Sequence, residues 1–362
     1  MKKVNFLLPG GGTLRRNPKA SGGYKVVYEY ANMLVGDGYS VNIILPASLL
    51  WKERKLIRKI RSVVLYILGK IDDKFYNPNS WFFLDTRVKV IWVPSLIEKY
   101  IPIADYTFAT GAETSEYLNK YSNNQGEKLY LIQGYENWNF NEKRLKETYK
   151  FNLKKIVISN WLKTIVDKYS SEESIVIENG LNFQEFTMDI LPENKNKFSI
   201  SMLYSDLCVK GSKYGLEGIR LLKKKYPKIV LNLFGLCKKP KNLEKWINYY
   251  YCPSRKELNN IYNSSALYLG TSLGEGWGLT LCEAMITGAA VVGTNVNGYD
   301  EFCYNMDTAL LVQSKNPQEM ANKLENLILN DKLRYRIAYS GNRNIKKYTW
   351  ERAYKILKEN LK

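Results

Sequence analysis

Two glutamates, Glu275 and Glu283, lie with seven residues between them in the segment GEGWGLTLCEAM (274–285). Two glycines, Gly276 and Gly278, fall inside this interval, and no other charged residue does. Carboxylates at this spacing can bind hydroxyl groups of one ligand, or they can act as a general acid and a general base. The elements around the two glutamates decide which of these chemistries the segment supports.

The segment connects an expected strand to an expected helix. ALYLGTS (266–272) has the pattern of a buried strand, and LTLCEAMITG (279–288) that of a helix stopped by a glycine. The first backbone N–H groups of this helix, those of residues 279–281, are free to bind an anion without a metal. Gly276 and Gly278 would let a phosphate approach the backbone closely.

The carboxylates flank this anion site on both sides. Glu275 precedes the helix and Glu283 lies about one turn inside it, so each can accept hydrogen bonds from hydroxyl groups on its own side of the anion. A molecule that presents hydroxyls, then phosphate, then hydroxyls fits this order. A nucleotide sugar, with its sugar, diphosphate and ribose, is such a molecule.

The composition removes several other kinds of chemistry. The chain has no histidine, which excludes the usual general base and every histidine-dependent triad. Its five cysteines show no CxxC spacing, which argues against a disulfide framework or a zinc site and favours a reduced, cytoplasmic protein. The formal net charge of +19 attracts anions such as nucleic acid, phospholipid head groups or phosphorylated small molecules.

Strand and helix patterns alternate along the chain. VNFLLP (4–9), YKVVYEYANMLVGDG (24–38) and YSVNIILP (39–46) predict a strand, a helix and a strand, the opening of a doubly wound parallel sheet. The alternation resumes at FSISMLY (198–204), after the polar and irregular stretch 184–197. We therefore expect an α/β fold with two Rossmann-like domains facing a cleft, where ligands bind at the carboxyl ends of the strands.

The length supports this division, because 362 residues are too many for one ordinary core. We expect an N-terminal domain over 1–183 and a C-terminal domain over 184–345. A C-terminal helix over 346–362 is expected to pack back on the N-terminal domain.

Residues 49–71 predict an amphipathic helix with six basic side chains and one acidic side chain, Glu53, in its first half. Such a helix can bind an anionic membrane surface, or it can face the core and expose a solvated basic side. No apolar run reaches the length of a membrane span. We favour the first alternative, which predicts a cytoplasmic protein bound peripherally to the inner face of the cell membrane.

The segment TSLGEGWGLTLCEAMITGAAVVGTNVNG (271–298) resembles the donor-binding signature of glycosyltransferase family 4, retaining enzymes of the two-domain GT-B fold. The resemblance extends over nearly the whole chain. Gly22 and Gly23 resemble the N-terminal loop of the family, and SNWLKTIVDKY (159–169) with IENGLN (177–182) resembles its passage near the domain boundary. YTWERAYKILKENL (348–361) resembles its C-terminal helix.

The resemblance implies a role for each donor-site residue. Glu275 contacts hydroxyls of the transferred sugar and Glu283 contacts the ribose, while Gly22 and Gly23 approach the donor phosphate. The backbone amides that bind the sugar and the diphosphate belong to Gly276, Gly278, Leu279 and Thr280. A basic clamp of the family has an arginine and a lysine. Here Lys210 matches the lysine, and Tyr204–Ser205 stands where the arginine should be, so Ser205 is included in the predicted donor site.

The acceptor side of the resemblance departs from the family, because many members place a histidine near the anomeric carbon. Gln133, Tyr135 and Glu136 in KLYLIQGYENW (128–138) are the candidates to replace it. Trp277 is a candidate wall of the sugar pocket, or it packs between the domains. In a retaining front-face mechanism the leaving phosphate itself can take the proton of the acceptor. The chain has no Asp-x-Asp motif, so we expect no metal site and no cofactor.

The predicted function is transfer of a hexose or deoxyhexose from a nucleoside-diphosphate sugar to a hydroxyl of a glycan, with a lipid-linked acceptor as the favoured substrate. The base of the donor is open among UDP, GDP and dTDP. Residues 104–118 and 130–136 loosely resemble a bacterial rhamnosyltransferase branch. The alternatives are a non-catalytic subunit of GT-B type and a hydrolysing sugar-nucleotide epimerase, whereas a nucleic-acid partner is not expected.

Overall fold

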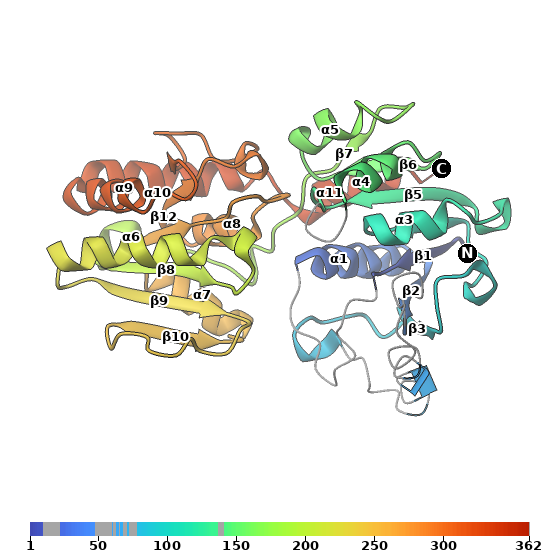
Figure 1. The fold of residues 1–362 in the computed structure, drawn as a ribbon, viewed down its shortest axis with the longest axis horizontal. Coiled ribbons are helices and arrows are strands. Elements are labelled where there is room, and N and C mark those ends of the chain that lie inside the picture. Colours follow the sequence, from blue (N-terminus) through green and yellow to red (C-terminus); the bar gives the residue numbers. More distant parts are fainter. Residues whose placement is uncertain are drawn as a thin grey trace. The chain divides into compact units, whose positions relative to one another are not determined.

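The structure is a computed structural model with two compact units (Figure 1). It describes residues 1–9, 22–47, 60, 63–64, 66–67, 71, 78–136 and 141–361. The first unit consists of Met1–Glu178 and Glu351–Lys362, and the second of Asn179–Trp350. We call them the N-terminal and the C-terminal unit.

The N-terminal unit is built on a seven-stranded sheet in the order β3-β2-β1-β4-β5-β6-β7, in which every pairing is parallel. Its strands are β1 (Lys3–Leu7), β2 (Ser40–Pro46), β3 (Lys89–Val93), β4 (Tyr106–Ala109), β5 (Glu127–Ile132), β6 (Lys154–Val157) and β7 (Ile175–Val176). Apolar runs such as that of β1 are buried because helices cover both faces of a parallel sheet.

The helices of the N-terminal unit connect these strands. They are α1 (Gly22–Gly36), α3 (Ala112–Leu118), α4 (Glu142–Tyr149) and α5 (Asn160–Val166), joined by α11 (Trp350–Glu359) from the end of the chain. The helical periodicity predicted for α1 is confirmed, since Val27, Tyr30, Ala31 and Leu34 are all buried. The predicted basic helix 49–71 falls mostly outside the described residues. Within the described ranges, no helix is long and apolar enough to cross a membrane.

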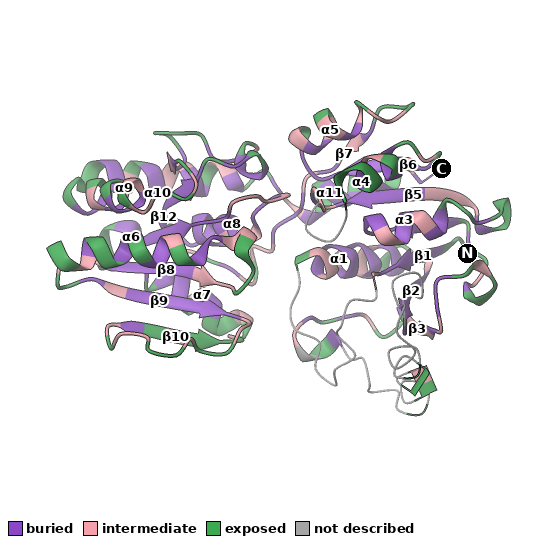
Figure 2. Ribbon diagram, viewed as in Figure 1, coloured by how far each residue is buried: buried purple, intermediate pink, exposed green. Residues whose placement is uncertain are grey.

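The C-terminal unit contains a second parallel sheet, with six strands in the order β10-β9-β8-β11-β12-β13. Its strands are β8 (Ser199–Tyr204), β9 (Val230–Gly235), β10 (Ile247–Tyr251), β11 (Leu267–Gly270), β12 (Ala290–Thr294) and β13 (Leu310–Val312). Figure 2 shows the inner strands buried and the edge strand β10 largely exposed. The predicted fold class of two Rossmann-like α/β units is therefore confirmed.

The helices of this unit are α6 (Ser212–Lys225), α7 (Arg255–Asn263), α8 (Leu279–Ile286), α9 (Pro317–Leu329) and α10 (Asp331–Ile345). Their apolar faces pack on the sheet around a core that includes Ile200, Leu231, Leu269 and Val292. Buried Lys195 connects α7 to α8, because its Nζ donates to Tyr262 O at 3.2 Å and to Thr287 O at 2.7 Å. Carbonyls at two helix ends are thereby satisfied.

The end of the chain returns to the N-terminal unit through α11. The boundaries of the C-terminal unit lie after Glu178 and after Trp350. The sequence predicts them after residues 183 and 345. Asp37, which follows α1, accepts hydrogen bonds from Tyr354 Oη at 2.9 Å and from Lys358 Nζ at 2.5 Å. These bonds fix α11 to the N-terminal unit.

Replacing Asp37 with asparagine is expected to lower the Tm of the protein by about 2–4 °C at neutral pH. The hydrogen bonds from Lys358 and Tyr354 lower the pKa of Asp37. Its charged carboxylate therefore stabilises the fold at pH values above the ordinary range of aspartate pKa values. The difference between the two proteins is expected to disappear as the pH falls through and below that range. Thermal unfolding at several pH values checks this, with Glu359→Gln on the same helix as the control. An equal effect of both variants would contradict it.

Candidate functional site

The segment that carries the two glutamates follows β11 and leads into α8, as expected from the sequence. Gly278 is the residue before the helix and adopts φ 106° and ψ 53°, a left-handed conformation that favours glycine. A Cβ atom on Gly278 would also overlap the ring of Tyr299. Two independent constraints therefore require glycine at the start of α8.

The loop before α8 packs closely against the short 3₁₀ helix η6 (Asn297–Tyr299), which follows the neighbouring strand β12. A Cβ atom on Gly298 would overlap the carbonyl oxygen of Glu275, and the Tyr299 ring contacts Gly278 as described above. Tyr299 is only 2% exposed. The shape of the loop is thus set by buried contacts rather than by the loop residues alone.

Two of the three predicted amides at the start of α8 are available to a ligand. Within the described part of the chain, the N–H groups of Leu279 and Thr280 have no hydrogen-bond partner, and both residues are half-buried. The prediction for Leu281 is wrong, because its N–H donates to Gly278 O at 3.0 Å. The hydroxyl of Thr280 accepts a hydrogen bond from Tyr268 Oη at 2.9 Å. Free amides at the positive end of α8 favour an anion there.

Glu275 and Lys210 form an ion pair in the structure. Lys210 Nζ lies 2.5 Å from Glu275 Oε1, and Ser272 Oγ donates to the same oxygen at 2.7 Å. Lys210 ends the short 3₁₀ helix η5 (Cys208–Lys210), which follows β8, the strand next to β11. The sequence predicts both residues at the donor site, but it does not predict this contact.

Ser205 lies in the loop between β8 and η5 and mainly shapes that loop. Its N–H donates to Ser212 Oγ at 2.9 Å, and its hydroxyl accepts from the N–H of Leu207 at 3.2 Å. No arginine takes the place of the missing clamp arginine by forming an ion pair with Glu275 in the described residues. Lys210 is therefore the basic group that this loop brings to Glu275.

Glu283 lies on the inner side of α8 and is only 5% exposed. Its Oε2 accepts a hydrogen bond from Tyr262 Oη at 3.1 Å, and its Oε1 lies 3.7 Å from Arg255 Nη1. Arg255 also lies 3.7 Å from Glu185. Sequence analysis missed Arg255. It is the first residue of α7, and no pattern along the chain indicated that this helix starts beside Glu283.

Trp277 does not line a pocket, which corrects the prediction that it forms a wall of the sugar site. Its side chain is 2% exposed and packs against Phe302 and Tyr348, with ring centroids 5.4 and 5.1 Å apart. The indole therefore stabilises the C-terminal unit from within. The neighbouring Gly276, by contrast, is half-buried.

Three of the predicted residues in the N-terminal unit come together at the start of α1. Gln133, just after β5, donates from Nε2 to Gly23 O at 3.2 Å. A Cβ atom on Gly23 would lie 3.5 Å from the Gln133 amide, and Gly22 beside it is exposed. The carboxyl end of β5 and the start of α1 thus form one edge of the unit, as the doubly wound topology requires.

Glu136 and Tyr135 point to different neighbours. Glu136 Oε2 accepts from the N–H of Ala112 at 3.0 Å, which places the carboxylate at the start of α3. Tyr135 Oη donates to Glu142 Oε1 at 2.9 Å. The two side chains therefore bond to different helices, α3 and α4, although both follow β5.

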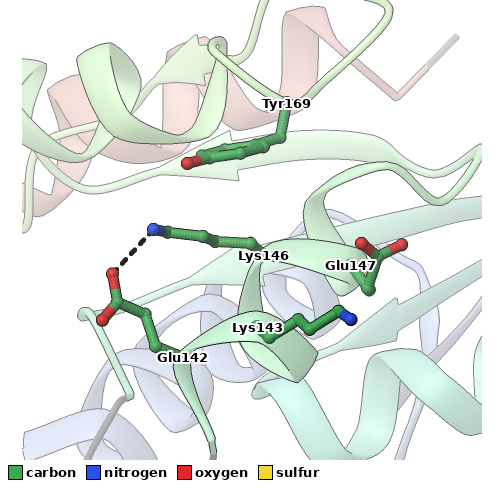
Figure 3. A pocket seen from close by; sticks show the side chains of 5 residues that line it. All are labelled: Glu142, Lys143, Lys146, Glu147 and Tyr169. Carbon is green, nitrogen blue, oxygen red and sulfur yellow. Dashed lines mark ion pairs between the residues drawn. The ribbon is translucent and has the colours of Figure 1, made fainter.

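A surface hollow of about 410 Å³ lies beside Glu142, lined by Glu142, Lys143, Lys146, Glu147 and Tyr169 (Figure 3). Lys146 Nζ is 2.7 Å from Glu142 Oε1 and 5.5 Å from the centre of the Tyr169 ring. The positive charge of Lys146 is thus already paired with the carboxylate of Glu142. Among the described residues, the hollow included, no group of three or more Cys, Asp or Glu side chains could hold a metal ion.

Two Rossmann-like units, each built on a parallel sheet, are the architecture of the GT-B fold. Comparisons with solved structures agree on the fold. Sucrose-phosphate synthase from Thermosynechococcus elongatus matches with a TM-score of 0.73 and 13% identity, over 99% of this chain and 98% of that one. HepE from Anabaena, solved in complex with UDP-glucose, matches with a TM-score of 0.73 and 15% identity, over 100% and 99%.

The sequence comparisons match this chain to glycosyltransferases. The model of the family described as glycosyl transferases group 1 matches residues 183–344, nearly all of the C-terminal unit. An uncharacterized glycosyltransferase from Haemophilus influenzae is 23% identical over 350 residues, which cover 92% of each chain. The matched region contains Lys210, Glu275 and Glu283, so the site described above lies within it.

Proposed function

We propose that the protein is a retaining, metal-independent glycosyltransferase of family 4 type. It moves a hexose or deoxyhexose from a nucleoside-diphosphate sugar to a hydroxyl of a glycan. One observation carries this proposal: the free amides of Leu279 and Thr280 lie at the start of α8, between the carboxylates of Glu275 and Glu283. The binding of UDP-glucose by the structural neighbour HepE supports a donor of the same kind.

Each group of the C-terminal unit takes one part of the donor. The amides of Gly278, Leu279 and Thr280 and the Lys210 ammonium bind the diphosphate, because they offer positive charge or N–H donors at the start of α8. Glu275 accepts hydrogen bonds from the sugar hydroxyls. Glu283, held by Tyr262, accepts from the ribose on the inner side.

The reaction follows from these contacts without a histidine. The bond between the anomeric carbon and the phosphate oxygen breaks, and a bond from the acceptor oxygen to the same carbon forms on the same face. The acceptor proton passes to the leaving phosphate. The protein stabilises the charge that develops on the diphosphate and holds the acceptor in position, which are the two largest sources of rate enhancement in such transfers.

The N-terminal unit supplies the acceptor side in this proposal. Gln133 beside Gly23 and Glu136 at the start of α3 both follow β5, at the carboxyl edge of the sheet. Their amide and carboxylate groups can hydrogen-bond glycan hydroxyls. A lipid-linked glycan is the acceptor that the basic composition favours.

Thermal shift with UDP, GDP and dTDP tests this function. One of them, at about 100 times its Kd, is expected to raise the Tm by about 3–6 °C. The corresponding nucleotide sugars should then be hydrolysed slowly without an acceptor, and equally fast with EDTA present.

The competing functions give other results in the same experiments. A non-catalytic subunit binds the donor without turnover, and an epimerase changes the configuration of the sugar without any acceptor. RNA binding with a steep salt dependence and no affinity for any nucleoside diphosphate would contradict the proposal.

A further inference from the structure

The Lys210–Glu275 ion pair is built into the fold of the C-terminal unit. The two loops that carry it are joined by hydrogen bonds from Leu273 N–H to Val209 O and from Thr271 Oγ1 to Lys210 O, both 2.7 Å long. The Lys210 and Glu275 side chains are 26% and 15% exposed. A pair between anchored, partly buried loops persists in solution better than one between two mobile surface side chains.

Each charge of this pair depends on the other. In the described part of the chain, Lys210 and Glu275 form no second ion pair, and the only other hydrogen bond to the Glu275 carboxylate comes from the Ser272 hydroxyl. A phosphate that binds Lys210 in place of Glu275 therefore leaves the Glu275 carboxylate with one neutral hydrogen bond, from Ser272. A charge that loses its partner in a partly buried site weakens whatever binding caused the loss.

The two ligands of the proposed reaction differ in what they offer to this pair. A nucleoside diphosphate offers a phosphate to Lys210 and nothing to Glu275, and its terminal phosphate adds a negative charge near the carboxylate. A nucleotide sugar offers the phosphate to Lys210 and sugar hydroxyls to Glu275, so both partners are replaced.

We propose that the Lys210–Glu275 ion pair is a partner-exchange element that makes the site discriminate between an intact nucleotide sugar and the nucleoside diphosphate product. The inference rests on the proposed function and adds product discrimination to it. Before a ligand binds, Lys210 and Glu275 contact each other. The intact donor opens the pair by satisfying both charges, and after sugar transfer the pair closes again and helps release the diphosphate.

Titration calorimetry with UDP, GDP and dTDP tests the inference in wild type and in Glu275→Gln. The neutral amide no longer holds Lys210, so the variant is expected to bind the nucleoside diphosphate about tenfold more tightly than wild type. Its affinity for UDP-glucose, GDP-mannose or dTDP-glucose should not rise in parallel. The ratio of the affinity for the nucleotide sugar to the affinity for the nucleoside diphosphate is therefore expected to be lower in the variant than in wild type.

Two controls separate this effect from a general change of charge. Glu217→Gln removes the same charge from an exposed position of α6, the helix that begins beside Lys210, and should change the affinity less than about twofold. In a Lys210→Gln background, Glu275→Gln should give no gain. A gain that persists in that background, or no gain in Glu275→Gln while wild type binds, overturns the inference and leaves the proposed function standing. If wild type binds none of the three diphosphates, both the inference and the proposed function are wrong.

Discussion

Replacing Glu275 with alanine is expected to lower the rate of sugar transfer by about 100- to 1,000-fold. The carboxylate is the group of the C-terminal unit that we assign to the sugar, and it is held by Lys210 Nζ and Ser272 Oγ at 2.5 and 2.7 Å. Without it the sugar loses its charged hydrogen-bond acceptor, while the amides of α8 that bind the diphosphate remain. Steady-state kinetics with the donor identified by thermal shift measure this loss.

The control is Glu217→Ala, which removes an exposed acidic side chain and should keep the transfer rate. Both variants should unfold at temperatures close to that of wild type, because Glu275 lies in a loop. If Glu275→Ala lost nucleoside diphosphate binding and transfer to the same extent, the separate assignment of sugar and diphosphate to Glu275 and α8 would be wrong.

Replacing Gly278 with alanine is expected to weaken binding of the nucleoside diphosphate by at least about tenfold and to lower the Tm. The backbone there has φ 106°, where an alanine costs about 1–3 kcal/mol, and the new Cβ would overlap the ring of buried Tyr299. The start of α8 must shift to relieve this overlap, which moves the amides of Leu279 and Thr280. Calorimetric titration and thermal unfolding measure the two effects.

Gly274→Ala is the matched control, because it makes the same chemical change in the same loop. A Cβ on Gly274 would meet only Val209 Cγ2, at 3.7 Å, and its φ does not lie in the left-handed region. This variant should bind and unfold like wild type. Equal behaviour of the two variants would show that the turn at Gly278 is not needed for the site.

The fold was predictable because each unit repeats one local pattern. Apolar strands such as β8, β9, β11 and β12 alternate with amphipathic helices, and this alternation alone implies parallel sheets. The pattern is weaker at β10 and at β13, which has only 3 residues. In β10 the sequence INYYY is polar and exposed at the edge of the sheet, so its alternation carries little hydrophobic signal.

The composition of the site was predictable, and several of its contacts were not. Glycine, helix start and carboxylates occur within one short segment, and their order along the chain is the basis for the order of groups that we propose for the ligand. The Lys210–Glu275 pair joins residues 65 positions apart, and Arg255 reaches Glu283 from another helix. Such contacts depend on which loops the neighbouring strands bring together.

Trp277 shows a second limit of prediction from the sequence. A tryptophan between two glycines of a ligand-binding loop is a reasonable pocket wall, yet the indole faces inward onto Phe302 and Tyr348. Both partners come from segments more than twenty residues later in the chain. Which side of a loop faces the core is decided by such distant segments.

The C-terminal unit is, in topological terms, an insertion within the N-terminal unit, because the chain enters it after Glu178 and leaves it after Trp350. Its two ends are neighbours, since the N–H of Leu181 donates to Tyr348 O at 3.0 Å. A segment whose ends lie side by side can be exchanged as a cassette without separating the ends of its host. The C-terminal unit, to which we assign the donor, is thus a segment that can be grafted between proteins of this architecture at these two junctions, with α11 left in place in the N-terminal unit.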